Sequence, residues 1–250
     1  MSVRTGLVSV TFRQLGVDEV VEVAAKAGLS AVEWGGDVHV PLGNLVTAKR
    51  VRNLTEVHGL QVAAYGSYLR AGNVDREEMR SAVATAEALG APMIRVWAGN
   101  VGTADAGVGD RMAVTRGLGE LAAMAASSGI EIAMEFHRNT LTDEVDSTIT
   151  LLLDVGAPNL KTYWQPPVDL DDAQCLAQLE ALMPWLSTVH VFSWWPSNNR
   201  LPLEARESLW RPVLDRLAAE PRQINALLEF VADDSPEQFT KDAANLHSWV

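Results

Sequence analysis

Short apolar segments alternate with longer amphipathic segments along the whole chain. The short segments are rich in β-branched and aromatic residues, which is typical of buried parallel strands. They predict eight strands, over Thr5–Val10, Ala31–Trp34, Gln61–Tyr65, Met93–Trp97, Glu131–Glu135, Leu160–Trp164, Thr188–Phe192 and Ala226–Phe230. Apolar residues at i, i+3 and i+4 in the longer segments predict eight helices, over Asp18–Ala27, Leu45–Val57, Arg76–Leu89, Arg111–Ser127, Asp143–Val155, Asp171–Met183, Leu203–Leu217 and Pro236–Trp249.

This alternation of strand and helix determines the expected fold class. Strands that follow one another through helices pair in parallel, by right-handed crossovers. The chain has 250 residues, the usual length of one (β/α)8 TIM barrel, so we predict a single α/β barrel domain over residues 1–250. A doubly wound sheet is the alternative. No G-x-G-x-x-G motif follows the first strand, where Gly16 stands alone, and this weakens the dinucleotide-binding form of that alternative.

Composition narrows the classes of partner. A net charge of −12 argues against a nucleic-acid partner, because affinity for nucleic acid rests largely on Lys and Arg side chains that neutralise phosphates. The single cysteine, Cys175, excludes an intrachain disulfide, and this fits a cytoplasmic protein. Residues Met1–Val10 read as the first strand rather than as a signal peptide, and no apolar run is long enough to span a bilayer.

Polar side chains lie at the ends of four consecutive predicted strands. They are a carboxylate, an amide, an imidazole and a second carboxylate: Glu135, Gln165, His190 and Glu229. In a parallel barrel the carboxyl ends of the strands form the active site. Because buried carboxylates persist when they are paired or metal-bound, these residues predict a divalent-metal site with oxygen and nitrogen ligands.

Each of these residues also has a structural interpretation. A histidine in a strand is often a hydrogen-bonded core residue, and a strand-end glutamate can pair with an arginine such as Arg95. Arg95 itself is either a contact for a substrate anion or a salt-bridge partner, and we favour the second. The coincidence of four polar residues on strands five to eight favours a functional site.

Further residues are candidates for substrate binding. His137 follows Glu135 by two positions, and Glu33 and His39 flank the end of the second strand. Trp97 belongs to a group of tryptophans near strand ends that either stack on a sugar or simply pack. Arg200, in a loop, is the candidate for holding a phosphate or carboxylate group, although a solvated arginine is its ordinary interpretation.

The strand-end motifs resemble those of the xylose isomerase-like TIM-barrel superfamily, and more narrowly its sugar phosphate isomerases/epimerases. The resemblance covers essentially the whole chain and is carried by Val32-Glu33-Trp34-Gly35-Gly36-Asp37-Val38-His39, Ala133-Met134-Glu135-Phe136-His137, Tyr163-Trp164-Gln165-Pro166, Val189-His190-Val191-Phe192 and Leu228-Glu229-Phe230-Val231. It implies a metal held by Glu135, His190 and Glu229. The family has an aspartate where this chain has Gln165, so the site carries one negative charge fewer.

The resemblance also implies a chemistry. The expected activity is isomerisation or epimerisation of a small sugar, ketose or polyol-derived carbonyl compound through a cis-enediolate. Glu135 and Glu229 would act as base and acid, and His137 would bind a substrate oxygen or relay a proton. The expected cofactor is Mn2+, with Mg2+ or Co2+ as alternatives.

Three rival functions stay open at this point. A lyase or dehydratase would use the same enediolate. A catalytically silent sugar-binding barrel is the rival that Gln165 supports. An abasic-site phosphodiesterase shares the barrel but needs many more histidines than the five in this chain. A homodimer is also left open, with Trp210 and Trp249 either lining its interface or packing helices on the barrel.

Overall fold

Eight parallel strands form a closed barrel in the computed structural model, which describes residues 3–250. The barrel strands are β1 (Val3–Val8), β2 (Ala31–Gly35), β3 (Gln61–Arg70), β4 (Met93–Trp97), β5 (Glu131–Met134), β6 (Leu160–Trp164), β7 (Leu186–Val191) and β10 (Ile224–Leu228). Their order around the barrel is β1-β10-β7-β6-β5-β4-β3-β2. The predicted (β/α)8 fold is therefore confirmed, and Met1 and Ser2 of the expected first strand lie outside the described residues.

A helix follows each barrel strand. The helices are α1 (Val17–Lys26), α2 (Leu45–Val57), α3 (Arg76–Leu89), α4 (Val108–Ala126), α5 (Val145–Val155), α6 (Asp172–Leu182), α7 (Glu207–Ala218) and α8 (Pro236–Ser248). Short 3-10 turns lie at η1 (Ser9–Phe12), η2 (Met183–Trp185), η3 (Leu203–Arg206) and η4 (Ala232–Asp234). Within residues 3–250, no helix is both long and apolar enough to cross a membrane.

The predicted and observed ends of several strands differ, and polar residues lie at these ends. Glu135 was predicted as the last residue of its strand and Glu229 as the residue before the last, but β5 ends at Met134 and β10 at Leu228. Strand β3 continues to Arg70, five residues beyond the predicted end at Tyr65. The sequence pattern also missed a small antiparallel hairpin after β7, formed by β8 (Ser193–Trp194) and β9 (Arg200–Leu201).

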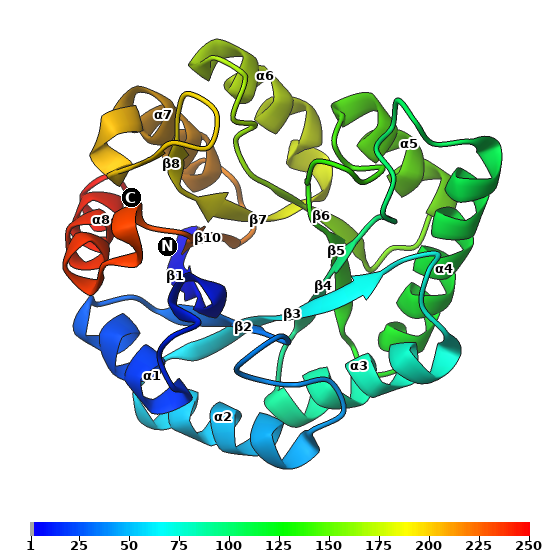
Figure 1. The fold of residues 1–250 in the computed structure, drawn as a ribbon, viewed down its shortest axis with the longest axis horizontal. Coiled ribbons are helices and arrows are strands. Elements are labelled where there is room, and N and C mark those ends of the chain that lie inside the picture. Colours follow the sequence, from blue (N-terminus) through cyan, green and yellow to red (C-terminus); the bar gives the residue numbers. More distant parts are fainter. Residues whose placement is uncertain (1–2) are drawn as a thin grey trace. The chain divides into compact units, whose positions relative to one another are not determined.

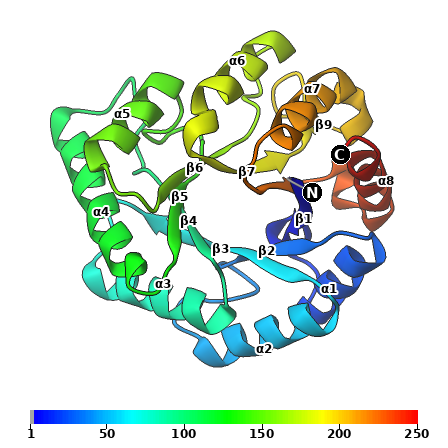
Figure 2. The same cartoon turned by 180° about the vertical axis from the view of Figure 1, so that it is seen from behind.

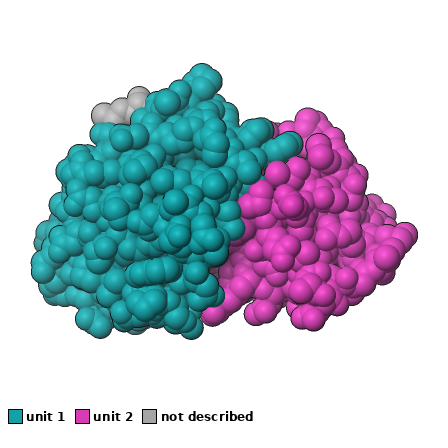
Figure 3. All heavy atoms as spheres, turned by 90° about the horizontal axis from the view of Figure 1, so that it is seen from above, with its two compact units in different colours: residues 1–34, 53–63, 164–250 teal, residues 35–52, 64–163 magenta. Residues whose placement is uncertain are grey.

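Contacts divide the chain into two compact units, which Figure 3 distinguishes by colour. Unit 1 comprises residues 1–34, 53–63 and 164–250, and unit 2 comprises residues 35–52 and 64–163. The boundaries fall inside β2, α2, β3 and β6, so they cut through secondary-structure elements rather than linkers. One domain over residues 1–250 stays a prediction.

Unit 1 holds the strands that carry His190 and Glu229. Strand β10 pairs in parallel with both β1 and β7, and Leu227 lies opposite Gly6 on one side and His190 on the other. Figures 1 and 2 show α6, α7 and α8 on the outer side of β7, β10 and β1. Gly6 allows the close approach of Leu227 from β10, because a Cβ there would lie 2.6 Å from Leu227 Cδ2.

Unit 2 contains the strands that lead to Arg95 and Glu135. Strand β4 pairs with β5 in the register Arg95↔Ala133, and α3, α4 and α5 lie outside β3, β4 and β5 in both ribbon views. Its interior includes a buried cluster of Ala64, Met93, Ala133 and Tyr163. The apolar packing of the strands positions the polar residues that follow them.

Candidate active site

Three potential metal ligands from three strand ends meet within unit 1. His190 Nδ1 lies 3.3 Å from Gln165 Oε1 and 3.3 Å from Glu229 Oε2. His190 has no exposed surface and Glu229 is 5% exposed. The structure thus brings together three of the four residues that the sequence predicted as metal ligands.

Backbone geometry fixes the position of Glu229. Its amide donates to the Val191 carbonyl at 3.0 Å, so the pairing with the neighbouring strand extends one residue past β10. Phe230, the next residue, has a positive φ of 49° and donates its amide to Thr11 Oγ1. A non-glycine residue in the left-handed region is uncommon and often lies beside a functional site.

Glu33 lies behind His190, on the side of its other ring nitrogen. Glu33 Oε2 is 3.6 Å from His190 Nε2, and neither side chain has exposed surface. Burial alone would lower the pKa of His190, but the charges and hydrogen bonds of Glu229 and Glu33 outweigh it and hold this pKa well above its usual value. The predicted role of Glu33 in substrate binding stays a prediction, and its position favours orienting His190.

Glu135 lies in unit 2 with two donors on one oxygen. Arg95 Nη1 donates to Glu135 Oε2 at 2.6 Å, and Trp97 Nε1 donates to the same oxygen at 2.7 Å. Arg95 and Glu135 are both buried. The salt-bridge interpretation of Arg95 is therefore the one that the structure shows, and Glu135 is held as a carboxylate.

Arg70 lies over the indole of Trp97, with its guanidinium carbon 4.2 Å from the ring centroid. Arg70 Nη1 donates to the Gly99 carbonyl at 3.0 Å, and the side chain is half-buried. Tyr68 packs edge-on against Trp97 and donates its hydroxyl to Asp37 at 2.8 Å. The sequence did not single out Arg70 or Tyr68, although polar residues at the end of a longer third strand were the signal that could have identified them.

His137 is half-buried and lies beside the same indole. Its ring centroid is 5.7 Å from that of Trp97, and its Nδ1 is 2.7 Å from the Arg138 carbonyl oxygen. A carbonyl can only accept, so Nδ1 is the donor in this contact, and Nε2 is the ring nitrogen on the other side of the imidazole. This arrangement suits a residue that accepts a hydrogen bond from a substrate hydroxyl.

The other two residues predicted to bind substrate are His39 and Arg200. His39 is 4% exposed. Arg200 forms an ion pair with Asp234 at 2.6 Å and stacks on Trp194 and Phe230. A substrate anion would compete with Asp234 for Arg200, so its predicted role in gripping an anion stays a prediction.

Four of the tryptophans are buried. Trp34 and Trp164 have no exposed surface, so they pack in the interior and cannot stack on a ligand. Trp210 is also fully buried and Trp249 is 7% exposed. Of the two interpretations of Trp210 and Trp249, packing of helices on the barrel is the one that their burial supports, and the homodimer stays a prediction.

The unit 1 donors are of the types that a hard divalent ion binds, and two of their separations suit one. Ligand atoms about 2.1 Å from one ion and at right angles lie about 3 Å apart, close to the two 3.3 Å separations at His190 Nδ1. In residues 3–250, no group of three or more His, Cys, Asp or Glu side chains surrounds a common metal position. The third donor is the uncharged amide of Gln165, and a ligating His190 must lose its proton.

Comparison with known proteins agrees with this fold. The model of the family described as "Xylose isomerase-like TIM barrel" matches residues 21–167. A 3-dehydroshikimate dehydratase from Bacillus anthracis is 25% identical over 199 residues, which cover 74% of this chain and 69% of that protein.

Solved structures share the whole fold. The crystal structure of the probable 3-DHS dehydratase AsbF from Bacillus anthracis has a TM-score of 0.82 and 19% identity, and 98% of each chain is covered. D-allulose 3-epimerase from Methylomonas sp. has a TM-score of 0.75 and 13% identity over 100% of this chain and 98% of that one. A xylose isomerase-like TIM barrel protein from Mycobacterium smegmatis, solved in complex with magnesium, has a TM-score of 0.70 and 14% identity over 95% and 90% of the two chains.

Proposed function

Because the chain belongs to the xylose isomerase-like TIM barrel family, we propose that it is an enzyme that removes a proton from the carbon next to a carbonyl group. The reaction that the site supports best is the dehydration of a small hydroxylated ketone that carries a carboxylate. The observation that carries this proposal is Arg70, stacked on Trp97 beside the strand end that leads to Glu135.

Arg70 supplies the preference for an anionic substrate. One of its donors binds the Gly99 carbonyl, while the planar guanidinium has five N–H donors in all. Arg95, in contrast, is committed to Glu135 at 2.6 Å. A guanidinium fixed by stacking binds a carboxylate with little loss of side-chain entropy. The relative named as a 3-dehydroshikimate dehydratase supports the same substrate class.

One carboxylate, Glu135, carries the proton transfers in this proposal. Glu135 is the base, because hydrogen bonds from Arg95 and Trp97 stabilise its charged form and orient it. It takes the α-proton, and the electrons of the broken C–H bond form an enediolate. Glu135 then passes this proton to the β-hydroxyl, which leaves as water while the enediolate electrons form the new double bond. The expected role of Glu229 as the acid stays a prediction. His137 binds a substrate hydroxyl through Nε2.

A divalent ion is the proposed cofactor, Mn2+ first, with Mg2+ or Co2+ as alternatives. Gln165, His190 and Glu229 would hold it, and when bound it would polarise the substrate carbonyl. Glu33 orients His190 from the opposite side of the imidazole ring. The magnesium complex of the Mycobacterium smegmatis relative supports this part of the proposal. Glu135 as a further ligand stays a prediction, because the ion would compete with Arg95.

An isomerase or epimerase of a neutral ketose is the second candidate, since it begins with the same proton removal. The observation in its favour is the aromatic surface made by Trp97, Tyr68 and His137, on which the C–H face of a sugar packs well. Return of the proton to the carbon, instead of loss of water, would give this outcome.

The test separates the two candidates by their products. The Mn2+-supplemented chain is incubated in D2O with 3-dehydroshikimate, and in parallel with neutral ketoses, and products are followed by absorbance and NMR. We expect the chain to remove water from the carboxylated ketone. Glu135→Gln should abolish this reaction, and Arg70→Met should raise its KM at least tenfold. Deuterium exchange into a ketose without reaction of the anionic substrate would establish the second candidate instead. No reaction and no exchange with either class would contradict both.

A further inference from the structure

The outer side of α4 is unusually apolar for a surface helix. Val108 is 79% exposed and Met112 is 66% exposed, one turn apart on the same helix. On α5, which packs beside α4 in unit 2, Leu153 is 65% exposed. Large apolar side chains that gather on neighbouring elements, rather than standing singly, mark an interaction surface.

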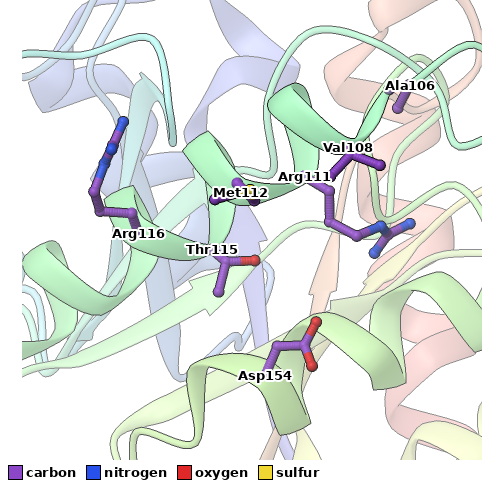
Figure 4. A pocket seen from close by; sticks show the side chains of 8 residues that line it. Ala106, Val108, Arg111, Met112, Thr115, Arg116 and Asp154 are labelled. Atoms are coloured by element: carbon purple, nitrogen blue, oxygen red, sulfur yellow. The ribbon is translucent and has the colours of Figure 1, made fainter.

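A groove of about 570 Å³ lies along these helices. The residues that line it come from the start of α4 and the end of α5: Ala106, Gly107, Val108, Arg111, Met112, Thr115, Arg116 and Asp154. Figure 4 shows Val108 and Met112 along α4, with Thr115 and Asp154 facing each other from the two helices. We call this surface the α4/α5 groove.

The two rims of the α4/α5 groove carry opposite charges. Arg116 is exposed on α4, and Asp146 and Asp154 are exposed on α5. Of the acidic residues of α4, Asp110 accepts from the Gly107 amide at the start of the helix, and Glu120 lies 4.0 Å from Arg76 of α3. Among the charged residues that line the groove, α4 contributes Arg111 and Arg116, and α5 contributes Asp154.

We propose that the α4/α5 groove is the contact surface for a second copy of this chain. A two-fold contact places the same patch on both partners, so the basic rim of one copy meets the acidic rim of the other. Arg116 then faces Asp154 in both directions, and Met112 enters the groove of its partner. A copy that carries a net charge of −12 repels another copy at long range, so this local complementarity selects the face that can pair.

The length of α4 leaves room for such a contact. Helix α4 has 19 residues and is about 28 Å long at 1.5 Å per residue. Standard interfaces bury about 800 Å² per partner around a central apolar cluster with a polar rim. Gly119, further along α4, has open space where a Cβ would be, and this allows a second helix to approach closely.

The oligomeric state of the full chain tests the proposal. We expect sedimentation equilibrium to show a dimer at micromolar concentration and Met112→Glu to raise its dissociation constant at least tenfold. Val46→Glu is the matched control, because Val46 is 82% exposed on α2, outside the groove, and should leave the dimer unchanged. A wild-type chain that is monomeric at high concentration, or equal effects of the two variants, would overturn the proposal.

Charge exchange and cross-linking locate the contact. Arg116→Asp and Asp154→Arg should each weaken the dimer, and the double variant should regain most of the affinity. Arg116→Cys/Asp154→Cys should form a disulfide-linked dimer on mild oxidation, since the native Cys175 is buried and unreactive in this assay. If neither charge exchange nor cross-linking gives the expected result although a dimer is present, the interface lies elsewhere and the proposal is refuted. Circular dichroism checks that each variant is folded.

Discussion

Glu33 and His190 face each other in the interior of unit 1, with Glu33 Oε2 3.6 Å from His190 Nε2 and no exposed surface on either side chain. The opposite nitrogen of the same imidazole ring lies 3.3 Å from both Gln165 and Glu229. A carboxylate behind a ligating histidine fixes its tautomer and strengthens it as a ligand.

We therefore expect Glu33→Gln to weaken Mn2+ binding about 10- to 100-fold, by isothermal titration calorimetry. The NMR shifts of the His190 ring nitrogens should change at the same time, which a purely structural role would not require. The exposed Glu22→Gln is the control. Unchanged metal affinity and ring shifts in Glu33→Gln would remove this role.

Gln165→Asp tests the effect of the missing charge. An added carboxylate next to His190 Nδ1 should tighten Mn2+ binding by roughly tenfold or more, because affinity for hard ions rises with the number of charged ligands. Gln165→Glu, with the same charge on a longer side chain, shows whether charge or geometry decides. If the aspartate binds Mn2+ no better than glutamine does, the ion does not use this position.

Arg95→Met should destabilise the protein by about 3–5 kcal/mol, because it leaves the carboxylate of Glu135 buried without its cation. Urea unfolding measures this change. The double variant Arg95→Met/Glu135→Gln should recover part of the loss, since the charge is then gone. Equal losses in the single and double variants would show that packing, not charge, explains the effect.

Asp242 gives a pH-dependent contribution to stability. Burial raises its pKa, although hydrogen bonds from the Leu203 amide and Gln238 act against that shift. A raised carboxyl pKa means that the folded state holds its proton longer than the unfolded state. Stability from this group is therefore present below the unfolded pKa of about 3.9 and is lost as pH rises through the folded pKa.

Asp242→Asn should remove this pH dependence and leave the protein as stable as the wild type, or more stable, at neutral pH. The amide oxygen can still accept from Leu203. Asp242→Ala should instead cost about 1–3 kcal/mol, because the buried Leu203 amide loses its acceptor. Urea unfolding from pH 4 to pH 8 measures both, and an Asn variant with an unchanged pH profile would contradict the assignment.

Much of the fold was predictable, for a local reason. The apolar run around His190 and the run before Glu229 are each a buried parallel strand, and their periodicity is visible without knowledge of neighbours. Because parallel strands present their carboxyl ends at one end of a barrel, placing His190, Gln165 and Glu229 together needed only the strand order.

The other residues needed contacts that sequence does not contain. Arg70 was missed because β3 continues past Tyr65 through Tyr68, a polar stretch that resembles a loop. The prediction that Arg200 binds an anion did not take account of Asp234. This residue lies 34 positions away in the chain and forms an ion pair with Arg200. Residues so far apart meet only after the chain has folded.

The sequence by itself determined the barrel and the positions of the strand-end residues, since both follow from the spacing of apolar and polar side chains. Only the tertiary structure decided how those residues are used: Glu33 behind His190, Arg95 on Glu135, and Arg70 stacked on Trp97. The physical reason is that the partner of a buried charge is set by packing between distant segments, and packing is not encoded in the local pattern of any one of them.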